Sequence, residues 1–176
     1  MTRLAVALIT ACWVGAAGCQ SSSSPDDTDT LVENRPVTPL VHEVYTAFGE
    51  PARFVVRDAR LWAEVWARTY AGRSEVPRRP TIDFSREMVV VAAQGGQGSS
   101  GYDISIERVA SRDGTMAVHV LATSPDERCV VLTVVTAPVV MVRVPQSTSQ
   151  VRFIEHTRIT PCDQPEEIGT GGRVAG

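Results

Sequence analysis

"GQGSSGYDISIERVASRDGTMAVHV", residues 96–120, decides how this chain folds. The opening GQGSSG matches the G-x-G-x-x-G fingerprint of dinucleotide-binding folds, which needs a helix after its last glycine to hold the pyrophosphate. After Gly101, however, apolar Tyr102, Ile104 and Ile106 alternate with polar residues. A period of two indicates a strand with one solvated face. The glycines therefore form a strand-to-strand turn, and we expect no nucleotide site.

The next part of the stretch predicts a β-hairpin. Asp113-Gly114 is a turn signal, and in the run after it Met116, Val118 and Val120 again occupy alternate positions. Two alternating runs joined by Asp-Gly are typical of a hairpin with a tight turn.

Most of the remaining folded sequence also predicts strands. "MVVVAA" (88–93) is a continuous apolar run, as in a central strand covered on both faces. "LVHEVYTAFG" (40–49) and "RFVVRD" (53–58) are two short strands or a hairpin. "CVVLTVVTAPVVMVRVP" (129–145) contains two β-rich runs broken by Pro138, and "VRFIEHTRI" (151–159) is the last strand.

One segment, "ARLWAEVWARTYAG" (59–72), predicts a helix. Asp58 provides an N-cap and Gly72 a stop. The bulky residues at helical spacing are Leu61, Trp62, Val65, Trp66, Thr69 and Tyr70. Trp62 and Trp66 could stack on a ligand, but we interpret this stripe as the buried face of the helix.

Together these patterns predict a mostly β fold with one helix, in the α+β class. We expect an antiparallel sandwich or half-open barrel of about eight strands, with one amphipathic helix packed on the sheet. The patterns fit either arrangement of the strands.

The N-terminal residues predict export and lipid anchoring. Residues 1–18 have one arginine ahead of a short apolar stretch, and Ala16-Ala17-Gly18-Cys19 resembles the lipobox of bacterial lipoproteins. Acylation of Cys19 would anchor the chain stably in a membrane. The residue after Cys19 is Gln20 and not the aspartate that retains many lipoproteins at the inner membrane. This favours the outer membrane of a cell envelope. The alternative is an ordinary secretory signal with an incidental Cys19.

Composition divides the rest into one domain and two polar ends. Residues 19–36 are rich in serine, acid and proline and predict a disordered tether, and residues 163–176 a disordered tail. Residues 37–162 have the size of a single domain. A formal charge of −3 and the lack of a concentrated basic stretch argue against nucleic acid as a partner.

Cys129 and Cys162 are the two cysteines that remain after the signal and the lipid site are set aside. In an exported protein they permit one intramolecular disulfide. The alternatives are two buried thiols or a pair of metal ligands. We predict the disulfide.

Other catalytic and metal patterns do not fit. The position after Gly101 lacks the Lys-Ser or Lys-Thr of a P-loop, and the serines do not fit a G-x-S-x-G elbow. His42, His119 and His156 are scattered without metal-ligand spacing. A triad of Ser99 or Ser100 with a distant histidine and aspartate stays open as the contrasting hydrolase hypothesis. We expect no enzyme, cofactor or metal.

Three stretches resemble the C-terminal domain of the PrcB family, a subunit of a bacterial surface protease complex. They are "DFSREMVVVAAQG" (83–95), "SSGYDISIERV" (99–109) and "TAPVVMVRVP" (136–145), within a resemblance that covers residues 84–145. In that family, Thr-Gly is frequent where this chain has Ser99-Ser100, and an aromatic residue often follows the proline where this chain has Val139. Because Val139 has no ring, any contact that uses an aromatic ring beside Pro138 is in doubt for this chain.

The resemblance implies a non-enzymatic, extracytoplasmic accessory protein that binds other proteins and stabilises or assembles a surface protease or envelope complex. The Ser-x-Gly-Tyr turn also resembles the Thr-Thr-Gly-Tyr loop of chagasin-type cysteine-protease inhibitors. Protease inhibition is therefore the alternative within the protein-binding class.

The predicted partner-binding loop consists of Gly98, Ser99, Ser100, Gly101 and Tyr102. Glycine permits close backbone approach, and tyrosine buries area while keeping a hydrogen-bonding tip. In the alternative interpretation, Tyr102 points into the core and the glycines only shape the turn.

Overall fold

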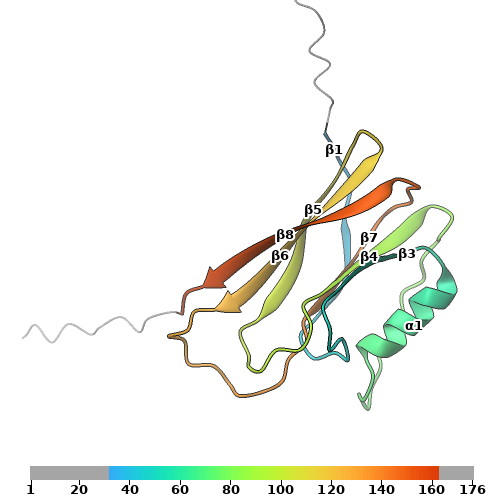
Figure 1. Ribbon diagram of the computed structural model, residues 1–176. Coiled ribbons are helices and arrows are strands. Elements are labelled where there is room, and N and C mark those ends of the chain that lie inside the picture. The colour runs from blue at the N-terminus through green and yellow to red at the C-terminus, as the bar shows by residue number, and fades with distance from the viewer. Residues whose placement is uncertain (1–31, 163–176) are drawn as a thin grey trace, which may run out of the picture.

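The computed structural model describes residues 32–162, which form two β-sheets and one helix stacked as three layers (Figure 1). The elements are β1 (Glu33–Asn34), β2 (Thr38–Glu43), β3 (Ala52–Val56), α1 (Ala59–Thr69), β4 (Glu87–Ala93), β5 (Asp103–Arg112), β6 (Thr115–Pro125), β7 (Val139–Pro145) and β8 (Gln150–Thr160). The predicted signal peptide (1–18), Cys19, most of the tether and the tail (163–176) lie outside the described residues.

The strands form two four-stranded sheets. The outer sheet has the order β1-β5-β6-β8, and the central sheet, which lies between the outer sheet and the helix, has the order β2-β7-β4-β3. The described strands do not close into a barrel, which confirms the sandwich. Five of the six strand pairs within residues 32–162 are antiparallel, as predicted, whereas β8 runs parallel to β6. The parallel pair arises because β7, in the other sheet, comes between them.

Strand β4 separates two hydrophobic cores, as its uninterrupted apolar sequence predicted. Met88, Val90 and Ala92 pack toward the outer sheet. Val89 and Val91 pack toward the helix. All five side chains are completely inaccessible to solvent. The strand therefore links the sheet-sheet core to the sheet-helix core.

Helix α1 begins and packs as its sequence predicted. The side chain of Asp58 accepts a hydrogen bond from the Leu61 N–H at 2.8 Å. Trp62 and Trp66 are buried against the central sheet, and their indole N–H groups donate to the carbonyls of Pro80 and Pro77 at 3.0 and 3.1 Å. The two tryptophans thus belong to the core and hold the loop before β4 against the helix.

The β5–β6 hairpin is also confirmed. Arg112 pairs with Thr115, which leaves Asp113 and Gly114 as a two-residue loop with φ of 50° and 71°. Positive φ at both positions is the requirement of a type I′ turn, and glycine and aspartate meet it more easily than most residues.

Two segments differ from their expected structure. The run 129–135 was expected to be a strand, but it forms none, and Thr136 makes only an isolated bridge with Gln97. Strand β7 already lies between β2 and β4 in the central sheet, so the run before it has no place there. Conversely, Glu33 and Asn34, within the predicted tether, form β1 on β5.

Candidate protein-binding surface

Three loops meet at one end of the sandwich, which we call the loop end: residues 44–51, 94–102 and 126–138 (Figure 1). Backbone hydrogen bonds join them. Gly96 N–H donates to the Gly49 carbonyl at 2.9 Å, and Ala137 N–H donates to the Val44 carbonyl at 2.8 Å. The loops therefore form one continuous surface.

Within this surface, the two serines of the predicted binding loop hold the loop at 126–138 in place. Ser100 N–H donates to the Leu132 carbonyl, and Ser100 Oγ accepts from Leu132 N–H, both at 3.0 Å. The carbonyl of Ser99 accepts from Thr136 Oγ1 at 3.0 Å. Their polar groups thus position a neighbouring segment.

Gly101 has a backbone that disfavours any other residue. Its φ is +92°, and a Cβ atom there would lie 3.1 Å from Cβ of Pro125. Gly98, in the same loop, does not have a positive φ, and a Cβ atom there would have no neighbour within 4 Å. Of these two glycines, only Gly101 therefore has a strict steric role.

Tyr102 is half-buried, so it is neither a core residue nor a freely exposed one. It lines a surface hollow of about 430 Å³ together with Pro125 and Ile159. The other lining residues are Ser124, Asp126, Glu127 and Arg128. The tyrosine can thus contact a partner side chain that enters this hollow.

The most exposed apolar residues of the loop end lie in a segment that the sequence had assigned to a strand. Val130, Leu132 and Val135 are 102%, 71% and 75% exposed. Tyr45, from the first loop, is 52% exposed. Such clustered exposure is uncommon on monomers and marks interaction surfaces. The uninterrupted β-branched sequence could not reveal it, because it equally fits a buried strand.

The predicted disulfide is present between Cys129 and Cys162, whose Cα atoms are 5.3 Å apart. It joins the start of the exposed segment to the residues just after β8. The apolar segment is therefore fixed at one end by a covalent bond and further along by the Ser99 and Ser100 contacts.

The histidines make contacts elsewhere. His42 Nε2 pairs with Asp103 Oδ1, and His119 Nδ1 lies 3.3 Å from His156 Nε2 on the outer sheet. In the described part of the chain no histidine hydrogen-bonds to Ser99 or Ser100, so these contacts do not assemble the hydrolase triad that the sequence left open. Residues 32–162 also contain no cluster of three or more potential metal ligands.

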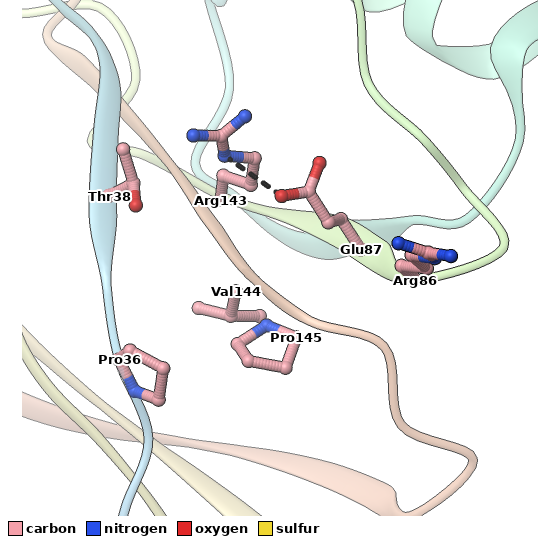
Figure 2. Close-up of a pocket in the computed structure, with 7 residues that line it drawn as sticks. All are labelled: Pro36, Thr38, Arg86, Glu87, Arg143, Val144 and Pro145. Atoms are coloured by element: carbon pink, nitrogen blue, oxygen red, sulfur yellow. Dashed lines mark ion pairs between the residues drawn. The ribbon is translucent and has the colours of Figure 1, made fainter.

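A second hollow, of about 240 Å³, lies at the opposite end of β4 from the loop end (Figure 2). Its charged side chains are paired: Arg143 Nε lies 3.4 Å from Glu87 Oε1, and Arg86 Nε lies 3.8 Å from Asp83 Oδ2. Prolines 36 and 145 form much of the remaining wall. This lining offers no nucleophile beside a base, so the hollow gives no basis for catalysis.

Comparison with known families identifies the central part of the domain. Residues 88–145 match the family model described as PrcB C-terminal. The match runs from β4 to the end of β7 and includes two of the three loops at the loop end. No curated protein and no solved structure gives a significant match. Within residues 32–162, no helix is both long and apolar enough to span a membrane.

Proposed function

We propose, from the premise that residues 88–145 form a C-terminal domain of the PrcB family, that this chain is a lipid-anchored extracytoplasmic accessory protein. It binds another protein through its loop end and stabilises or assembles a surface protease or envelope complex. The family match suggests an accessory protein associated with a protease complex. The anchor, the partner and the binding loop are further steps of the proposal.

The observation that carries the binding role is the pair of tyrosines at the loop end. Tyr45 is 52% exposed, and Tyr102 lines a surface hollow. Aromatic residues next to a hollow are typical anchors of protein interfaces. Because the disulfide and the serine contacts pre-order this surface, binding would lose less conformational entropy.

The position of β1 supports an orientation for the anchored protein. Glu33 pairs with Ser111, close to the Asp113–Gly114 turn, whereas the loop end lies before Asp103 at the other end of β5. A ten-residue strand is about 30 Å long. A tether from Cys19 would therefore join the domain at the end remote from the loop end, which keeps the loop end accessible to a protein.

Protease inhibition is the alternative function, and one observation favours it. Three loops from different parts of the chain gather at one end of a sandwich, which is an arrangement that could enter a protease cleft. Titration of the protein against a papain-type cysteine protease tests this directly. Stoichiometric inhibition that Tyr102→Ala weakens would favour the inhibitor over the accessory role.

The accessory role is tested by affinity capture from the native cell envelope. We compare the natural chain with the double variant Tyr45→Ala, Tyr102→Ala. The control is Val76→Ser, which removes an apolar side chain of similar exposure, 55%, from the loop after α1. The proposal expects a protease or other envelope protein with the natural chain and the control, and at least tenfold less with the double variant. Equal recovery with all three would contradict it.

Anchoring is tested separately with Cys19→Ala. The natural chain should stay with membranes through an alkaline wash, and the variant should be released. If the variant also stays in the membrane fraction, the lipid site is wrong, whatever the capture experiment gives.

A further inference from the structure

We propose that residues 130–135 form an interface between two copies of this chain, which pair antiparallel about a twofold axis at Thr133. The proposed interface is the outer edge of the loop at 126–138. It is separate from Tyr45 and Tyr102, the contacts of the proposed envelope partner.

Within residues 32–162, the backbone hydrogen bonds that the segment makes to other loops lie along one side. On its inner side, Leu132 exchanges bonds with Ser100, and Thr136 exchanges both of its backbone groups with Gln97 at 2.7 and 3.0 Å. Thr136 and Gln97 thus form an isolated antiparallel bridge, and Leu132 is held by the backbone N–H and the side chain of Ser100. The inner side of the segment is therefore attached to residues 97–100 at two points.

On the outer side, none of the described residues accepts a hydrogen bond from the N–H of Val131, Thr133 or Val135. These residues alternate with Leu132 and Thr136, whose backbone groups bond to residues 97–100. If Thr133 pairs with Thr133 of a second copy, then Val131 pairs with Val135. The three residues whose N–H groups have no partner among residues 32–162 are therefore the same three that a twofold pairing uses.

The composition of the segment favours its own copy as the occupant. Residues 129–142 contain no charged side chain, so two copies meet without repulsion. Pairs of β-branched residues and Thr–Thr pairs across strands are favourable. The segment also lacks the lysines, prolines and inward charges with which exposed strand edges usually avoid pairing, up to Pro138.

One contact in the single chain must change on association. Val134 N–H donates to the Leu132 carbonyl at 3.0 Å, which bends the backbone at Thr133. This local bond interrupts an extended conformation at Thr133 in one copy. Pairing would replace it with bonds across the axis and straighten the segment.

The interface is small, so the dimer is expected to be weak. Six residues a side bury less area than the 1,200 Å² or so at the lower limit of stable interfaces. Confinement of both copies to one membrane would raise their effective concentration. The hollow beside Tyr102 is lined by Ile159 and residues 124–128, which lie outside 130–135, so pairing leaves it open.

Sedimentation velocity of the full chain with Cys19→Ala, which removes the proposed lipid site, tests the dimer. We expect the mean mass to rise toward two copies with concentration. Val135→Asp should weaken association at least tenfold, because it places two charges beside the axis. Val76→Asp is the control, since Val76 is also exposed, at 55%, but lies outside the segment.

A cysteine placed on the axis tests the register. Paired Thr133 residues would have Cα atoms about 5.5 Å apart, within the range of a disulfide, so Thr133→Cys should cross-link two copies under mild oxidation. Glu127→Cys, exposed in the same loop, should not. A chain that stays monomeric up to millimolar concentration would overturn the proposal. So would a dimer indifferent to Val135→Asp, or a monomer that instead binds phosphatidylcholine vesicles through this segment.

Discussion

Arg53 of β3 and Glu155 of β8 form a two-pronged ion pair, with Nε–Oε1 and Nη2–Oε2 distances of 2.7 and 2.9 Å. Each residue lies on an edge strand of a different sheet. The pair therefore connects the two layers along the side where neither sheet has a further strand among the described residues.

Replacing Arg53 with methionine should lower the free energy of unfolding by about 1 kcal/mol, because a bidentate, charge-assisted contact is lost. Urea denaturation measures the change. The control is Arg60→Met, since Arg60 meets Glu64 in an exposed pair within one helix and should contribute only a few tenths of a kcal/mol. Equal effects of the two changes would contradict a special role for the inter-sheet pair.

Gly101→Ala should destabilise the protein by about 1 to 2 kcal/mol, the usual cost of a left-handed backbone conformation in a residue with a Cβ atom. The φ of +92° and the contact with Pro125 provide the reason. Thermal unfolding measures the loss. Gly98→Ala, in open space in the same loop, should change stability little. If both variants unfold at the same temperature, the backbone of Gly101 is not the cause.

Stability should fall on mild acidification because of His119. The guanidinium of Arg108 donates to Nε2 of His119 at 3.0 Å, which requires the neutral imidazole. Burial, then Arg108 and His156, lower the pKa of His119, while Glu107 opposes them. The unfolded chain thus binds a proton near pH 6.5, and the folded chain only at lower pH. The stability that neutral His119 contributes to the fold is complete above pH 6.5. It is lost as the pH falls toward the lowered pKa of His119 in the folded chain.

The effect is measured as the free energy of unfolding at pH 7.5 and pH 5.5. The natural chain should lose more stability than His119→Gln, by a small amount because the site is partly solvated. Parallel pH profiles for the two proteins would show that His119 does not cause the acid sensitivity.

Reduction of the Cys129–Cys162 bond should cost about 3 kcal/mol of stability, given the 33-residue separation of the cysteines. The double variant Cys129→Ala, Cys162→Ala should unfold like the reduced natural chain and should not respond to reductant. Mass spectrometry of exported protein provides an independent check, because two free thiols would rule out the bond.

The sequence predicted elements whose signals are local. The β5–β6 hairpin follows from alternation around Asp113-Gly114, and helix α1 from Asp58 and the spacing of its tryptophans. The buried strand β4 follows from a continuous apolar run. In each of these, neighbouring residues alone determine the pattern.

The sequence could not predict features that depend on which segments meet. The run 129–135 has the composition of a strand, but the place beside β4 is taken by β7. The pairing of His119 with His156 depends on the parallel register of β6 and β8. The exposed apolar surface was missed for the same reason, since exposure is set by distant neighbours.

The parallel pairing of β8 with β6 makes the two layers depend on each other. After β6 the chain leaves the outer sheet, adds β7 to the central sheet and only then returns as β8. The connection that a parallel pair requires therefore runs through the other sheet. Loss of either sheet should release the other, so the described domain should melt in a single cooperative transition.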